Sequence, residues 1–247
     1  MSNRGRWAAR IDHAVEAVKW PVAFIALLTL PLFAWGLLRL MLHVLSRPLG
    51  VMPLIAGTLG FIFLWRRWLD HSRIGRWMIT LEHELTHAIF AWVTGHRIVA
   101  FRASVGRGGE VRFLGRGNWL ITIAPYFFPT AALTLLLIAY LMPISFLPWH
   151  GFFLGIALGF HLASTYRETH RDQSDLQLVG GRFCWMFLPT ANLAVLGLLV
   201  AWVHGGSADV GVWLNHVRAP VVALADQWPK VSALDSTPLD HEFSPTK

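Results

Sequence analysis

The longest uncharged stretch most constrains what this chain can fold into. Gly117 to Tyr166 are 50 consecutive residues without one Asp, Glu, Lys or Arg. A soluble domain carries about 25% charged residues, whereas this chain of 247 residues has 14%, with 55% hydrophobic residues and a mean hydropathy of +0.49. So few charges cannot cover the surface of a soluble globular enzyme. The composition also excludes a disordered chain and a disulfide-stapled domain, and it predicts an integral membrane protein.

The basic residues indicate a membrane partner. The net charge is +7, but 18 of the 21 Lys and Arg residues lie at or before Arg182, mostly beside apolar runs. This is the bias of cytoplasmic loops in membrane proteins, so we expect a lipid bilayer as partner and no nucleic acid. Basic residues from Arg4 to Lys19 place the N-terminus inside. The lone cysteine, Cys184, excludes an internal disulfide and any multi-cysteine metal site.

The apolar runs predict an all-α membrane bundle of about five to six membrane helices. A spanning helix needs about 20 mainly apolar residues. We expect a polytopic membrane domain over residues 1–204 and a C-terminal tail over 205–247, in which an amphipathic helix at Val210–Leu234 precedes a disordered end. Pro125 and Pro129 should bend or break one of the membrane segments. The candidate segments are Trp20–Leu42, Pro48–Trp65, Trp77–Thr94, Asn118–Leu141, Gly151–Tyr166 and Phe183–His204.

One apolar segment carries ionisable residues, which at membrane depth indicate a functional site. Within Trp77–Thr94, His83-Glu84-Leu85-Thr86-His87 is an HExxH motif. On a helix, His83 and His87 lie one turn apart on the same face and can bind one Zn²⁺ ion, with Glu84 beside them as general base. Arginines flank the segment at both ends, and this charge pattern favours a helix that enters the membrane and returns.

A zinc site needs a third protein ligand. The candidates lie between two apolar segments, in the sequence from Glu168 to Asp175. We favour Asp175, because a helix that starts there would place its carboxylate just within the membrane. His170, Asp172 and Glu168 remain alternatives.

A glycine-rich segment follows the HExxH helix. Five glycines between Ser104 and Asn118 bracket a strand-like piece, Glu110–Leu114, which predicts a short β-hairpin or edge strand. A free strand edge can bind an extended peptide by strand addition. A basic loop resting on anionic lipid headgroups is the alternative.

Together these motifs resemble the site-2 protease family of intramembrane zinc metalloproteases, in particular its short bacterial peptidase-like branch. The similarity rests on HELTH in an apolar segment, GRGGEV, ITIAPYFFP and QSDL, within Trp77–Cys184. It implies that His83, His87 and Asp175 bind Zn²⁺, that Glu84 is the catalytic general base or acid, and that the hairpin guides substrate. It further implies a bacterial inner (cytoplasmic) membrane protein that cleaves membrane-protein or peptide substrates.

Two other functional classes remain open. One is a non-proteolytic zinc-binding membrane protein that acts as a sensor or scaffold. The other is a transporter or structural bundle in which His83 and His87 are merely packed. Neither the substrate nor the oligomeric state follows from the sequence.

Overall fold

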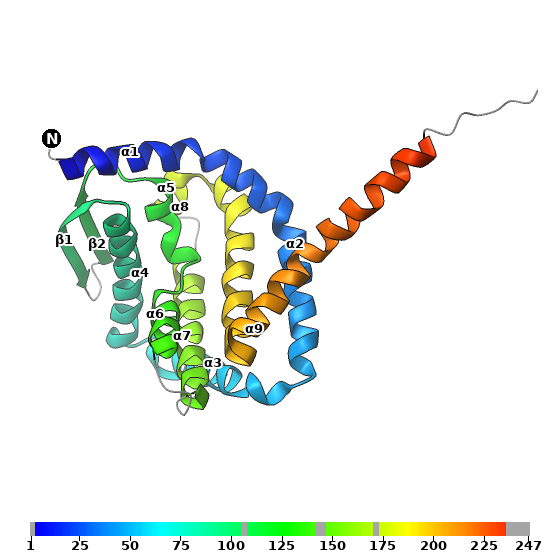
Figure 1. The fold of residues 1–247 in the computed structure, drawn as a ribbon. Coiled ribbons are helices and arrows are strands. Elements are labelled where there is room, and N and C mark those ends of the chain that lie inside the picture. Colours follow the sequence, from blue (N-terminus) through cyan, green and yellow to red (C-terminus); the bar gives the residue numbers. More distant parts are fainter. Residues whose placement is uncertain (1–2, 105–107, 142–146, 170–172, 236–247) are drawn as a thin grey trace, which may run out of the picture.

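The computed structural model describes residues 3–104, 108–141, 147–169 and 173–235, which are mostly helical with one two-stranded hairpin (Figure 1). Three single-turn or π-helical pieces, η1 to η3, connect the longer elements. The elements are α1 (Asn3–Ala17), α2 (Lys19–Leu45), η1 (Pro48–Gly50), α3 (Met52–Leu64), η2 (Trp65–Leu69), α4 (Arg73–Val93), β1 (Arg97–Ser104), β2 (Gly108–Leu114), α5 (Trp119–Ile123), η3 (Ala124–Tyr126), α6 (Thr130–Leu141), α7 (Leu147–Glu168), α8 (Ser174–Val179) and α9 (Gly181–Asp235).

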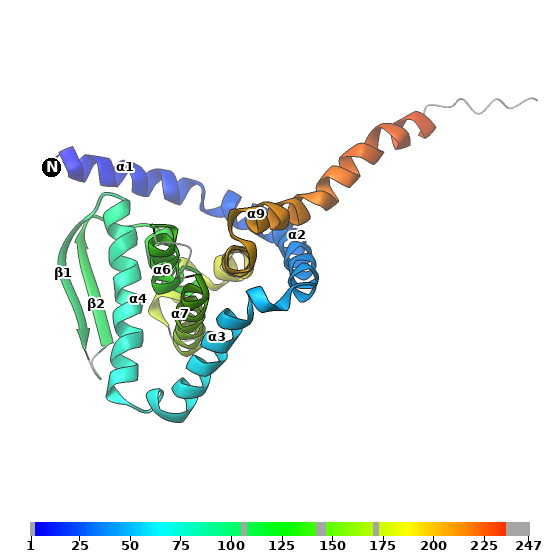
Figure 2. The same ribbon diagram turned by 60° about the horizontal axis from the view of Figure 1, so that its bottom comes forward.

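The helices pack as pairs that are distant in the sequence. α2 packs along α9, and α3 packs along α7, which also contacts α6. Figure 2 shows α4 between the hairpin on one side and α6 and α7 on the other. α4 therefore lies inside the assembly, where its polar residues are shielded by other elements.

Glycines allow the closest of these helix contacts. A Cβ added at Gly57 of α3 would lie 2.1 Å from the carbonyl oxygen of Phe152, and one at Gly155 of α7 would lie 2.2 Å from that of Leu54. Thr58 donates a hydrogen bond to the Gly155 carbonyl oxygen over 3.0 Å. Small residues and a threonine hydroxyl are typical of packed membrane helices.

The predicted number of five to six membrane helices is not confirmed. Among the described residues, two helices are long and apolar enough to cross a membrane, Lys19–Leu45 and Gly181–Asp226. The bent pair Trp119–Tyr126 and Thr130–Ile138 adds a third if it counts as one span. The other candidates are too short or too polar: α3 has 13 residues, and α4 carries Glu82 and the HExxH motif with its two histidines and one glutamate.

The break in the third segment lies where the prolines predicted it. α5 and η3 end at Tyr126, α6 begins at Thr130, and the two parts meet at an angle of 82°. Proline removes a backbone donor and clashes with the preceding turn. The bend turns α5 and η3 toward α4.

The predicted hairpin is present. β1 and β2 pair antiparallel, with Ala103 opposite Gly109 and a register irregularity between Ile98 and Ala100. Both strands contact α4, so the hairpin lies along the HExxH helix.

The expected tail begins at a kink. In α9, Gly205 and Gly206 have non-helical backbone angles, and Gly206 has φ of +63°, a conformation that favours glycine. The chain is helical again beyond it, where Trp213 packs edge-on against Phe33 of α2. Of the predicted disordered end, residues 236–247 lie outside the described residues.

Candidate metal centre

The HExxH motif lies within α4, whose ends are both capped. At the start, Ser72 Oγ accepts a hydrogen bond from the Gly75 amide over 2.8 Å. At the end, the Thr94 hydroxyl donates to the carbonyl oxygen of Phe90 over 2.7 Å. Side-chain caps of this kind satisfy helix ends that would otherwise be unpaired. The 21 residues of α4 form a helix about 32 Å long.

The structure brings His83, His87 and Asp175 together, although Asp175 is 88 residues from His87 in sequence. Asp175 Oδ2 lies 3.3 Å from His83 Nε2 and 3.2 Å from His87 Nε2. The two Nε2 atoms are 3.1 Å apart. The histidine side chains are 8% and 12% exposed and that of Asp175 is 23% exposed, so the three atoms face one partly buried point.

The spacing of the three atoms fits a zinc ion. Zinc bonds of about 2.0–2.1 Å at tetrahedral angles place neighbouring ligand atoms about 3.4 Å apart. The observed separations of 3.1, 3.2 and 3.3 Å are close to that value. Two imidazole nitrogens and one carboxylate oxygen also form a common catalytic zinc set, which leaves a fourth position open. These residues can therefore hold a metal ion.

A backbone carbonyl fixes the tautomer of His87. His87 Nδ1 lies 2.8 Å from the carbonyl oxygen of Ile121 in α5. A carbonyl oxygen only accepts hydrogen bonds, so Nδ1 carries the proton and Nε2 of the neutral ring presents its lone pair. Metal-binding histidines commonly have such a partner on the other ring nitrogen. α5 is itself capped by Asn118, whose Oδ1 accepts from the Ile121 amide over 3.2 Å.

Asp175 lies in the first turn of the short helix α8. The Tyr126 hydroxyl donates to Asp175 Oδ2 over 3.5 Å, and the Tyr126 ring stands edge-on to His83 at 5.5 Å. A metal ion at this point would be bound by Asp175 as a carboxylate, since metal ligands of this type are deprotonated.

The sequence left Glu168, His170 and Asp172 as alternative third ligands. The side chain of Glu168, at the end of α7, accepts a hydrogen bond from Gln173 over 3.4 Å, and it is not among the three converging ligand residues. His170 and Asp172 are outside the described residues.

Glu84 lies against the hairpin. A Cβ added at Gly109 of β2 would be 2.2 Å from Glu84 Cγ and 2.5 Å from Glu84 Oε1. The glutamate side chain thus occupies the space that any other residue at position 109 would fill. Glu84 follows His83 directly, so it projects about 100° round the helix from the ligand face, toward the strand that runs beside it.

Glu82 has a place in the structure that the sequence did not suggest. Its buried carboxylate accepts a hydrogen bond from Ser164 of α7 over 3.2 Å, and its other oxygen is 3.8 Å from His161 Nδ1. On the same side, the hydroxyls of Thr86 and Thr130 are 2.5 Å apart. These contacts hold α4 against α7 and α6.

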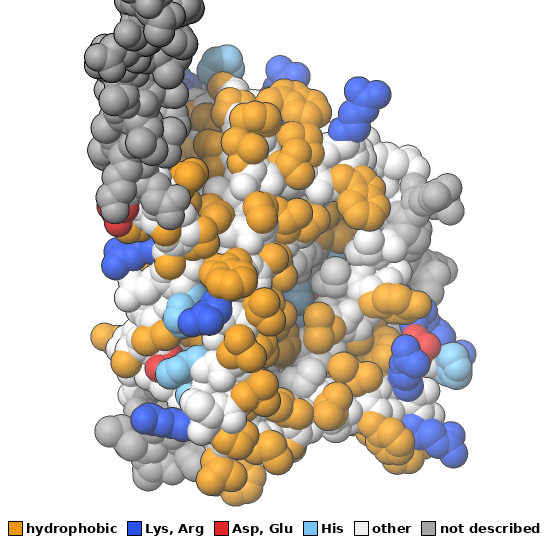
Figure 3. Space-filling view, turned by 90° about the vertical axis from the view of Figure 1, so that its right-hand side faces the viewer, with side chains coloured by type: hydrophobic (Ala, Val, Ile, Leu, Met, Phe, Trp, Pro, Cys, Tyr) orange, Lys and Arg blue, Asp and Glu red, His pale blue; other side chains and the backbone are white. Residues whose placement is uncertain are grey.

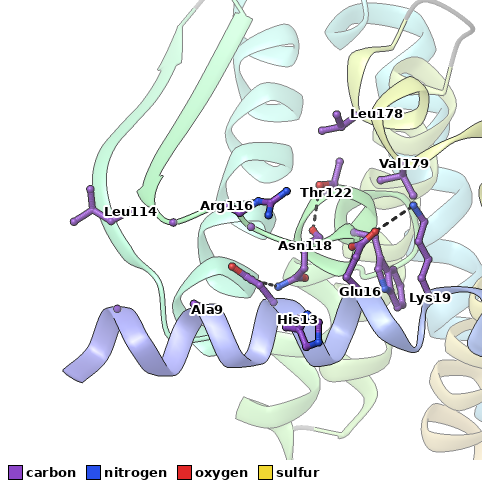
Figure 4. Close-up of a pocket in the computed structure, with 15 residues that line it drawn as sticks. Ala9, His13, Glu16, Lys19, Leu114, Arg116, Asn118, Thr122, Leu178 and Val179 are labelled. Carbon is purple, nitrogen blue, oxygen red and sulfur yellow. Dashed lines mark hydrogen bonds and ion pairs between the residues drawn. The ribbon is translucent and has the colours of Figure 1, made fainter. Parts of the chain in front are cut away.

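A cavity of about 880 Å³ lies beside the centre (Figure 4). It is bounded by α1, by the loop before α5 and by Leu178 and Val179 of α8, and Asn118 spans it to reach Asp12 of α1 over 2.7 Å. None of the three converging ligand residues lines it. The cavity is therefore separate from the ligand cluster.

The motifs ITIAPYFFP and GRGGEV contain Ile121, Tyr126 and Gly109, but the sequence did not assign these three residues a role at the site. Ile121 contributes a backbone carbonyl, which has no sequence signature. Tyr126 lies between Pro125 and Pro129 at the helix break, and Gly109 belongs to the glycine-rich hairpin, so both lie in segments that the sequence had marked as unusual.

A helix with two histidines and an adjacent glutamate, facing a carboxylate among apolar helices, is the arrangement of a metallopeptidase site. Residues 54–169, just under half of the chain, match the model of the Peptidase M50B-like family. The match supports membership of the site-2 protease family and indicates a peptidase. It includes His83, Glu84, His87 and both strands but ends before Asp175. No curated protein and no solved structure matches the chain.

Proposed function

We propose that this protein is an intramembrane zinc metalloprotease that hydrolyses peptide bonds of membrane-protein substrates. The observation that carries the proposal is the convergence of His83, His87 and Asp175 on one point, with Glu84 on the same helix. The peptidase family match and the apolar helices around the centre support it. We place the protein in a bacterial inner membrane with its N-terminus inside.

The chemistry divides between the metal and the chain. When bound by His83, His87 and Asp175, Zn²⁺ lowers the pKa of a water toward about 7 and polarises a peptide carbonyl. Glu84 accepts the proton of the attacking water at its carboxylate and passes it to the leaving amine. The Ile121 carbonyl and the Tyr126 hydroxyl keep His87 and Asp175 in position.

The hairpin supplies the binding site for substrate in this proposal. Each strand of a two-stranded sheet has one unpaired edge, which can bind an extended peptide through main-chain hydrogen bonds. β2 carries Gly109, which lies against Glu84. An extended substrate segment paired with β2 would therefore run past the catalytic carboxylate.

Glu84→Gln tests the proposal. The substitution keeps the size of the side chain and all three proposed zinc ligands but removes the proton acceptor. We expect bound zinc to be unchanged and cleavage to fall at least about 100-fold, within the range for loss of a general base. The assay is cleavage of a tagged single-span membrane protein, chosen from a panel as one that the wild type cuts. Glu16→Gln on α1, where Glu16 forms an ion pair with Lys19 at 3.6 Å, is the control.

The same experiment separates the proposal from a zinc sensor or scaffold. If wild type and Glu84→Gln bind zinc equally and neither cleaves any substrate of the panel, the proteolytic proposal fails and the scaffold is favoured. If Glu84→Gln cleaves as fast as wild type, the role of Glu84 is wrong.

A further inference from the structure

A second group of side chains that could hold a metal ion lies across the molecule from α4 (Figure 1). His43 is near the end of α2, His204 directly precedes the kink in α9, and Asp209 follows it. Their ligand atoms lie within 4.8 Å of one another. The group shares no residue and no helix with the proposed catalytic centre.

The contacts within this group resemble those of the first centre. His43 Nε2 lies 3.5 Å from Asp209 Oδ1, and His204 Nδ1 is hydrogen-bonded to Asp209 Oδ2. The rings of His43 and His204 stand edge-on with centroids 5.3 Å apart. Two imidazoles therefore approach one carboxylate, as His83 and His87 approach Asp175.

The outer ring nitrogen of His204 is also held by a backbone carbonyl. His204 Nε2 lies 3.1 Å from the carbonyl oxygen of Arg47, which only accepts hydrogen bonds. Nε2 therefore carries a proton. The close contact between Nδ1 and Asp209 Oδ2 then needs either a second proton on the ring or a metal ion between the two atoms. A proton satisfies one nitrogen–oxygen pair, whereas a metal ion satisfies both histidines and the carboxylate together.

The kink in α9 brings the ligand residues of this site together. Gly206 has φ of +63°, which lets the chain turn back so that Asp209 reaches His204. A Cβ at Gly205 would lie 2.5 Å from the Asp209 carboxylate, so glycine leaves the space that this side chain occupies. The two glycines thus bring ligands from both sides of the break to His43 on α2.

The three side chains of the site differ in exposure. The side chain of His204 is 4% exposed and that of Asp209 is 14% exposed, whereas that of His43 is 33% exposed. Figure 3 shows a largely hydrophobic face with a small group of histidine, acidic and basic side chains near its left edge. A metal ion can reach a partly buried site of this kind from the His43 side.

We propose that His43, His204 and Asp209 bind a second zinc ion, which fastens the kink of α9 to the end of α2. Two imidazoles and a carboxylate suit Zn²⁺. The ion links α2 to the helical segments on both sides of Gly205–Gly206, and it is separate from the proposed catalytic zinc.

The test is the number of zinc ions bound per chain, measured by equilibrium dialysis against buffered Zn²⁺ on full-length protein in detergent, purified with a tag that contains no histidine. We expect two ions for the wild type, one for His43→Ala, one for His87→Ala and none for the double variant. His216→Ala is the matched control, since His216 lies on α9 outside the converging group, and it should keep two.

A thermal melt makes the test independent of folding defects. Added Zn²⁺ should raise the melting temperature of His87→Ala, because a ligand that binds only the folded state stabilises it, but not that of the double variant. One bound ion in the wild type that persists in His43→Ala and disappears in His87→Ala would overturn the second site and leave the catalytic proposal intact. Two ions in His43→Ala would overturn it as well.

Discussion

Replacing Gly109 with alanine tests whether the hairpin sets the position of Glu84. The added Cβ would lie 2.2 Å from Glu84 Cγ and 2.6 Å from Glu84 Cδ, whereas carbon atoms in contact lie about 3.5–4.0 Å apart. The glutamate must therefore move by about 1 Å or more. A displacement of about 1 Å at a reacting group costs about 100-fold in rate, or about 2.7 kcal/mol in activation free energy.

The fold should tolerate this substitution, because the clashing atoms belong to a side chain that can turn. Bound zinc should also be unchanged, since His83 and His87 lie on another face of α4. The assay is cleavage of the same membrane-protein substrate, with zinc content and melting temperature measured in parallel. Gly108→Asn is the control: a Cβ there meets nothing within 4 Å, and asparagine tolerates the positive φ of this position. Wild-type cleavage by Gly109→Ala, or loss of zinc from it, would refute the reasoning.

Three further predictions concern residues that support the metal centre or the packing of the helices around it. Tyr126→Phe removes the hydroxyl that donates to Asp175, so zinc affinity measured against a competing chelator should fall about 10-fold while the chain stays folded; unchanged affinity would contradict the supporting role. Asp12→Ala removes the carboxylate that lies 3.1 Å from buried His96 and 2.7 Å from buried Asn118. It should lower the free energy of unfolding, measured by chemical denaturation, by about 3 kcal/mol. Glu16→Ala on the same helix is the control and should change this free energy little. Gly57→Ala forces α3 away from the Phe152 carbonyl and should destabilise the fold by about 1–3 kcal/mol. Gly60→Ala on the same helix, where a Cβ meets nothing within 4 Å, should not destabilise it. Equal melting temperatures for the two variants would contradict the close-packing argument.

Local features of the fold were predictable because they depend on residues that are near one another in sequence. The HExxH spacing predicted two histidines on one helix face, and the glycines between Ser104 and Asn118 predicted a hairpin, which β1 and β2 form. The break between α5 and α6 lies at the prolines that predicted it. In each case the signal is a local preference of the backbone.

The number of membrane helices and the surroundings of the ligands could not be obtained in the same way. α3 and α4 are apolar runs in sequence, but one is short and the other carries buried Glu82 and His83. Glu82 and His83 form hydrogen bonds with residues of α7 and α8, which are about 80 to 90 residues away in the chain. The tautomer of His87 depends on a backbone carbonyl, and the position of Glu84 on a missing Cβ at Gly109. A backbone carbonyl has no sequence signature, and a glycine alone does not show which side chain lies against it.

The proposed function is tested most directly by locating the bond that is cut. The substrate is a single-span membrane protein incubated with purified protein in water labelled with heavy oxygen, and the products are read by mass spectrometry. Zinc-dependent hydrolysis inside the membrane predicts a cut within the apolar segment of the substrate and one heavy oxygen in the new carboxyl terminus. Neither should occur with Glu84→Gln or after zinc is removed by a chelator. A cut that persists in Glu84→Gln, or products without labelled oxygen, would contradict the account.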